Sequence, residues 1–93
     1  MASIKDLKKE LIYTYGALLD QCYLVQMVFP GVDPQAAQAV DDAIQAAYAE
    51  SLAGLSRKVQ GGAAARAAAV RKEFDAKVEE LSAKVEQLAE RKA

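Results

Sequence analysis

The sequence predicts an all-α protein of a single domain, residues 1–93, folded as an antiparallel three-helix bundle of long helices. Apolar residues recur at intervals of three and four over long segments, which is the period of one helix face. Two short segments rich in proline or glycine interrupt this pattern, as turns do. No segment shows the strict alternation of a half-buried strand. With 93 residues the chain is near the small end of sizes that bury a core without disulfides or metals.

The first helix is expected over residues 3–29. Ser3 followed by Asp6 resembles a capping box with a shorter acid. The face that it buries is a row of apolar residues at helical spacing: Ile4, Leu7, Leu11, Tyr15, Leu18, Cys22, Val25 and Phe29. Pro30 and Gly31 end the helix, because proline removes a backbone donor and glycine frees the backbone to turn.

The second helix is expected over residues 34–60, after the turn that Pro30 to Asp33 forms. Asp33 supplies a capping acceptor and Pro34 has a backbone angle suited to the first helical position. Its apolar row is Ala37, Val40, Ile44, Ala47, Tyr48, Leu52, Leu55 and Val59. Small residues beside this row, at Ala43, Ala47 and Gly54, should let a neighbouring helix approach closely.

The third helix is expected over residues 63–92. Gly61 and Gly62 would together cost about 2 kcal/mol inside a continuous helix, so the pair predicts a turn. An alanine-rich stretch of high helix propensity follows it and leads into the row Val70, Phe74, Val78, Leu81, Val85 and Leu88. The pairs Glu73 with Lys77 and Glu80 with Lys84 have the i, i+4 spacing of a solvated face.

The end of this third helix also resembles a coiled coil. Val78 and Val85 fall at a positions and Leu81 and Leu88 at d positions, which suits a parallel pair of helices. The flanking positions argue against a coiled-coil dimer, since Lys77 would face a serine and Lys84 an alanine. Packing within the chain's own bundle is therefore the favoured interpretation.

The composition argues against several classes of function. The chain has no histidine and one cysteine, so the commonest general base and the usual zinc ligands are missing. We therefore expect no catalytic residue, no metal site and no cofactor, and a protein that is not an enzyme. The single Cys22 lies in an apolar row and is expected to be a small buried hydrophobe. The formal net charge of -1 gives no global attraction to nucleic acid or an anionic membrane.

A local cluster of positive charge nevertheless surrounds the second turn. The only charged residues between Glu50 and Glu73 are Arg57, Lys58, Arg66, Arg71 and Lys72. Weak binding of nucleic acid or another polyanion through this basic turn, around residues 57–72, is the alternative function. Because the cluster contains no aromatic side chain that could stack on a base, solvated cations around a turn are the simpler interpretation.

The first helix carries a second apolar row, opposite its core row at about 100° per residue. Tyr13, Ala17, Asp20, Leu24 and Met27 form it, and Val28 widens it. A three-helix bundle cannot cover two opposite faces of one helix, so we expect an interface at Tyr13, Ala17, Leu24, Met27 and Val28. The expected partner is a second copy, in a helical dimer, with an unidentified protein as the alternative. The simpler alternative is a set of tolerated surface hydrophobes.

Two short sequences, IKDLKKE at 4–10 and DQCY at 20–23, precede the proline turn, and a third, VDDAI at 40–44, follows it. Together they resemble a family of small, uncharacterised, all-helical bacterial proteins. The resemblance covers the first half of the chain, and the alanine-rich stretch after Gly62 departs from it. It implies a helical fold in a bacterial cytoplasm and no particular activity. The cytoplasm is also expected because charges occupy the start of the chain where a signal peptide is apolar, and no segment is long enough to span a membrane.

Overall fold

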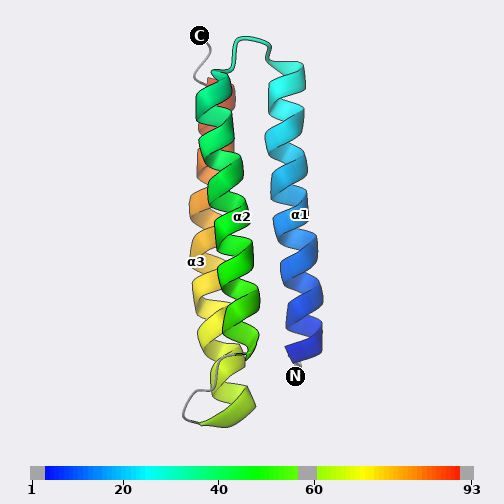
Figure 1. The fold of residues 1–93 in the computed structure, drawn as a ribbon, viewed down its shortest axis with the longest axis vertical. Helices are drawn as coiled ribbons and strands as arrows, with labels where there is room; N and C mark the ends of the chain where they lie inside the picture. Colours follow the sequence, from blue (N-terminus) through cyan, green and yellow to red (C-terminus); the bar gives the residue numbers. More distant parts are fainter. Residues whose placement is uncertain (1–3, 57–60, 91–93) are drawn as a thin grey trace.

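The computed structural model describes residues 4–56 and 61–90, which form a bundle of three helices (Figure 1). They are α1 (Ile4–Val28), α2 (Pro34–Ser56) and α3 (Gly62–Glu90). Each helix contacts both of the others, and the bundle measures 49 × 18 × 16 Å. α2 runs antiparallel to α1 and α3 (Figure 1). The predicted three-helix bundle is therefore confirmed.

The turn between α1 and α2 forms where the sequence predicts it. The N–H of Phe29 donates to the carbonyl oxygen of Val25 at 2.9 Å, and the N–H of Val32 donates to the carbonyl oxygen of Phe29 at 3.0 Å. Asp33 caps α2, because its Oδ1 accepts from the N–H of Gln35 at 3.0 Å. The side chain of Val32 is buried and closes this end of the core.

The second turn uses the glycine pair as expected. Gly61 and Gly62 have φ angles of +99° and +77°, in the left-handed region that other residues rarely adopt. The predicted end of the second helix at residue 60 lies outside the described residues, as do residues 1–3 and 91–93 at the ends of the outer helices. The first turns of α3 extend beyond the start of α1 (Figure 1).

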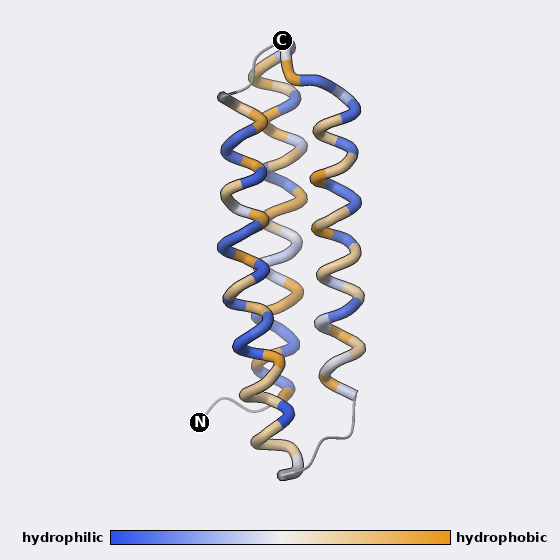
Figure 2. The backbone as a smooth tube through the Cα atoms, turned by 90° about the vertical axis from the view of Figure 1, so that its left-hand side faces the viewer, coloured by the Kyte–Doolittle hydropathy of each residue, from blue (hydrophilic) through white to orange (hydrophobic). Residues whose placement is uncertain are grey.

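One apolar row from each helix forms the core, and hydrophobic and hydrophilic positions alternate along each helix (Figure 2). All the predicted core residues that the structure describes are buried or partly buried. Leu81, Val85 and Leu88, which resemble a coiled-coil seam, are buried within this bundle. Of the helices in the described part of the chain, none combines the length and apolar character that a membrane span requires.

Tyr15 lies at the centre of this core and is fully buried. Its ring stacks on the ring of Tyr48 from α2, with centroids 5.5 Å apart and planes inclined by 20°. The ring of Phe74 from α3 meets it edge-on at 5.6 Å. These are the offset and edge-to-face geometries that aromatic pairs prefer, so the three rings join the three helices at one level.

Gly54 leaves room for α3 to pack closely against α2. An ideal Cβ built on Gly54 would lie 3.1 Å from Cγ2 of Val70, which is shorter than an ordinary van der Waals contact. The prediction that small residues on the second helix admit a neighbouring helix is thus confirmed at this position.

The surface ion pairs of α3 differ in part from those expected. Lys84 pairs with Glu80 at 3.6 Å, as the spacing predicts. Lys77 does not pair with Glu73; its Nζ lies 3.7 Å from the same Glu80. Glu80 lies between the two lysines on one face of the helix, so it attracts both.

We expect Gly54→Leu to destabilise the bundle by about 1–3 kcal/mol, because the added side chain overpacks the contact with Val70. Ala53→Leu is the matched control, since Ala53 is exposed on the same helix. Urea unfolding followed by circular dichroism measures both variants. Equal stabilities would contradict a close α2–α3 contact at Gly54.

Candidate protein interface

The outer face of α1 carries the exposed large hydrophobic side chains of the described residues. We use this name for Ile12, Tyr13, Gly16, Ala17, Asp20, Tyr23, Leu24, Met27 and Val28. The large apolar side chains of this face range in exposure from 43% for Ile12 to 77% for Tyr13. All five residues expected at an interface, Tyr13, Ala17, Leu24, Met27 and Val28, are exposed and lie here.

Sequence reasoning missed Ile12 and Tyr23 as members of this face. At about 100° per residue both lie on one flank of the Tyr13 row, so the helical angle alone could have found them. They are 43% and 63% exposed. Their inclusion makes the apolar surface wider than the single row that the sequence suggests.

The other two helices present a different surface to solvent. Within the described residues, every exposed large hydrophobic side chain belongs to α1. The exposed positions of α2 include Ala39, Ala46 and Ala49 among glutamines and acids, whereas those of α3 are charged residues and alanines in similar number. Among residues 4–56 and 61–90, the exposed large apolar side chains are therefore confined to α1.

A single charge interrupts the outer face of α1. Asp20 is the only charged residue between Leu11 and Val28. It is exposed and forms no hydrogen bond or ion pair with another side chain in the described part of the chain. A contact made through this face must therefore either exclude Asp20 or provide it with a donor.

Among the described residues of the basic turn, Arg71 forms an ion pair with α1. Arg57 and Lys58 lie outside the described residues, Arg66 is half-buried, and Lys72 is exposed. Arg71 forms two hydrogen bonds to the carboxylate of Glu10, at 2.8 and 2.6 Å, and its guanidinium lies 5.9 Å from the ring centroid of Phe74. The Arg71 guanidinium is therefore bound to the Glu10 carboxylate of α1.

This bidentate pair shifts the pKa values of both of its groups. The hydrogen bond from Arg71 lowers the pKa of the Glu10 carboxyl, and the same bond raises the pKa of Arg71. Both side chains remain well exposed, so the pair links α3 to α1 but contributes little to the stability of the fold. An anion would have to compete with Glu10 for this arginine.

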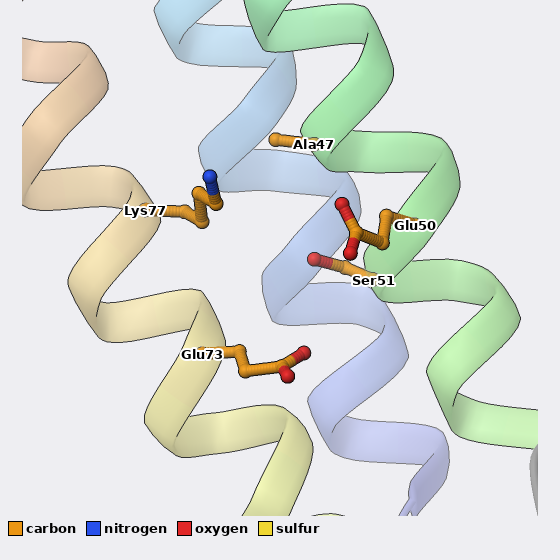
Figure 3. A pocket seen from close by; sticks show the side chains of 5 residues that line it. All are labelled: Ala47, Glu50, Ser51, Glu73 and Lys77. Carbon is orange, nitrogen blue, oxygen red and sulfur yellow. The ribbon is translucent and has the colours of Figure 1, made fainter.

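A small groove of about 120 Å³ lies between α2 and α3 (Figure 3). Ala47, Glu50 and Ser51 line it from α2, and Glu73 and Lys77 line it from α3. Its charged side chains are exposed at the rim, whereas Ser51 is buried. The groove is far smaller than the several hundred cubic ångströms of an ordinary ligand pocket.

The hydroxyl of Ser51 is bonded to the core tyrosine. Tyr15 Oη and Ser51 Oγ are 2.9 Å apart, and either can be the donor. Burial raises the pKa of Tyr15, although the bond to Ser51 acts in the opposite direction. Tyr15 therefore stays protonated at neutral pH, and the arrangement satisfies two buried hydroxyls without activating a nucleophile.

Cys22 is buried, as expected for a small hydrophobe. Its thiol lies 3.7 Å from the carbonyl oxygen of Ala37 and donates to it. Burial is the main cause that raises the pKa of this thiol, and the nearby charge of Asp41 adds to the shift. A raised pKa keeps the group as an unreactive thiol at neutral pH.

Among the described residues, no group of three or more histidine, cysteine, aspartate or glutamate side chains is placed to hold a metal ion. No protein-family model, curated protein or solved structure shows a significant match to the chain. The resemblance of the first half of the chain to small bacterial helical proteins thus stays an expectation.

Ser51→Ala should destabilise the protein by about 1–3 kcal/mol, because it leaves the buried Tyr15 hydroxyl without a partner. Tyr15→Phe should destabilise the protein in the same way, because it leaves the buried Ser51 hydroxyl without a partner. The double variant should cost less than the sum of the two single changes, since it removes both hydroxyls. Urea unfolding of all four proteins gives the coupling energy, and strict additivity would contradict the bond.

The free energy of unfolding should fall as pH rises above about 9 to 10. Burial raises the pKa values of Tyr15 and Cys22 in the folded chain, so the unfolded chain loses these protons first. Stability from both groups is present below their unfolded pKa values and declines as pH rises towards their folded values. Urea unfolding from pH 7 to 11 tests this, and a smaller decline in Cys22→Ala would identify the share of the thiol.

Proposed function

We propose that the protein is a non-enzymatic helical interaction module that forms a homodimer through the outer face of α1. One observation carries the proposal: every exposed large hydrophobic side chain of the described residues lies on this helix. Monomeric proteins rarely leave apolar patches of several hundred square ångströms in water. A protein partner removes this surface from water.

The size of the apolar surface supports a stable contact. If a fully exposed large side chain is taken as about 200 Å², the six large hydrophobics of the outer face expose roughly 700 Å². Stable protein interfaces bury roughly 800 Å² on each partner, including their polar rim. A second copy brings an equal surface of the same character, and closed two-fold dimers are the commonest assemblies of small proteins.

The polar groups of the interior support a non-enzymatic role. Ser51 is hydrogen-bonded to Tyr15, and each hydroxyl is the buried partner of the other. Cys22 is buried with a raised pKa. With no histidine in the chain, neither side chain has the usual general base beside it.

Light scattering of the full chain at micromolar concentration should give twice the monomer mass of 10.0 kDa. The double variant Leu24→Asp, Met27→Asp should raise the dissociation constant at least about a hundredfold, because two carboxylates would then be desolvated in an apolar contact. Both residues are more than half exposed, so the fold itself should persist.

The matched control is Ala46→Asp with Ala49→Asp on α2. Its two positions have the same spacing and are exposed, and it adds the same charge. It should remain a dimer. A parent chain that is a monomer throughout would overturn the proposal, and a dimer that persists in the α1 variant would place the contact elsewhere.

A further inference from the structure

Asp20 lies at the centre of the outer face of α1, both around the helix and along it. It follows the fully buried Leu11 by nine residues, which is two and a half turns at 100° per residue, so it lies on the side of the helix opposite the core. Along the axis it lies midway between Tyr13 and Met27, seven residues from each. The surface neighbours of Asp20, three and four positions away, are all uncharged: Gly16, Ala17, Tyr23 and Leu24.

A contact that covers this face removes the Asp20 carboxylate from water. Tyr13 and Met27 are 77% and 62% exposed, and their backbones are about 21 Å apart along the axis at 1.5 Å per residue. A partner that buries both side chains also covers Asp20, which lies between them. In a symmetric dimer each copy presents the same patch, so two carboxylates lose water together. A charge that is buried without a counter-charge is strongly unfavourable.

The outer face itself offers Asp20 no positive charge. The other polar side chains of this face are Tyr13 and Tyr23, whose phenolic hydroxyls donate hydrogen bonds without supplying charge. The nearest lysine of α1, Lys9, lies eleven residues before Asp20, which is about 16 Å along the axis. It therefore lies outside the apolar stretch of the helix.

A second copy does not bring a lysine to Asp20 without losing apolar contact. In an antiparallel pairing that sets Lys9 of one copy against Asp20 of the other, Leu24 meets Lys5. In a parallel pairing in register, Asp20 meets the same carboxylate of the other copy. Whenever the apolar side chains of the two copies meet, Asp20 is therefore desolvated without a cation from α1.

The other two helices do not neutralise Asp20 within the described part of the chain. α2 and α3 pack against the core side of α1, opposite Asp20. α2 contains no lysine or arginine, so its charged residues are all acidic. On α3, Arg71 is bound to Glu10 of α1. Lys77 and Lys84 pair with an acid within α3 itself.

We infer that self-association of the protein is linked to protons through Asp20, so that the dimer tightens as the pH falls from neutral to mildly acidic. This inference rests on the proposed function and adds the regulation of the same face. A carboxylate that loses water without gaining a cation favours its neutral form. The dimer therefore binds protons that the two monomers release, so lowering the pH favours the dimer and raising it favours the monomers.

Dissociation constants of the full chain, measured by light scattering over a concentration series at pH 7 and pH 5, test this linkage. The parent dimer should tighten at least about tenfold over this interval, because up to two protons, one on each copy, bind on association. Asp20→Asn removes the buried charge, so its dimer should be at least about tenfold tighter than the parent at pH 7. The variant should also lose the parent's additional dependence on pH.

Asp42→Asn on α2 is the matched control. Asp42 is exposed, and its replacement changes the net charge as Asp20→Asn does. This matching is needed because the isoelectric point of about 5.4 lies within the interval, so the loss of net repulsion acts on every variant. Asp42→Asn should behave as the parent does. Asp20→Glu keeps a titrating carboxyl group and should retain the dependence on pH.

The fold should not change over this interval. The bond from Arg71 lowers the pKa of the Glu10 carboxyl, so this pair stays largely ionised at pH 5. Asp20 and Asp42 are both exposed, so their replacement leaves the core intact. Circular dichroism should therefore give the same helical signal for the parent and the variants at both pH values.

The outcomes separate the linkage from the proposed function. Equal effects of pH on the parent and on Asp20→Asn would overturn the linkage while the proposed self-association stands. An Asp20→Asn dimer no tighter than the parent at pH 7 would place Asp20 outside the contact and would also overturn the linkage. If the parent and Asp20→Asn are monomers at both pH values, the linkage and the proposed function are both wrong.

Discussion

The burial of Tyr15 is the interaction around which the bundle is organised. Its ring stacks on Tyr48 of α2, meets Phe74 of α3 edge-on, and carries its hydroxyl to Ser51. The ring is large enough to touch both neighbouring helices from a single position on α1, so it sets their heights relative to one another. The hydrogen bond then requires a particular residue of α2 to face inwards, because an unpaired buried hydroxyl would be costly. A chain of 93 residues buries a small core, so it cannot tolerate many unpaired buried polar groups.

Once the Tyr15 face of α1 is turned inwards, the opposite face of the same helix is turned to solvent. The rigid register of a helix allows no other result, since residues on opposite sides cannot both reach one core. α2 and α3 meet this constraint with small, polar or charged outer residues. α1 meets it with Tyr13, Tyr23, Leu24, Met27 and Val28, which are all more than half exposed. Large apolar side chains are exposed on one of three otherwise similar helices, and this uneven distribution supports the proposed self-association.

Much of the fold was predictable from local chemistry. The intervals between Leu7, Leu11, Leu18 and Cys22 specify one helix face, and burial of that face follows from the hydrophobic effect alone. The turns were equally readable, since Asp33 caps α2 and the paired Gly61 and Gly62 adopt backbone angles that disfavour other residues. The sequence predicted the central row of the candidate interface. It did not predict the full width of the apolar face, because Ile12 and Tyr23 fall outside the row of Tyr13.

The sequence by itself determined where α1 ends and where α2 and α3 begin, which row of each helix is buried, and that α1 has a second apolar side. These properties depend on neighbours within about one helical turn, and such neighbours are fixed by the helix geometry. Only the tertiary structure decided which distant side chains meet. Arg71 reaches Glu10 across 61 positions, and Ser51 reaches Tyr15 across 36. Those partners depend on the relative rotation and height of packed helices, which no local pattern encodes. The same packing places Gly54 against Val70 but leaves Gly16 in open space, although both are glycines within a helix.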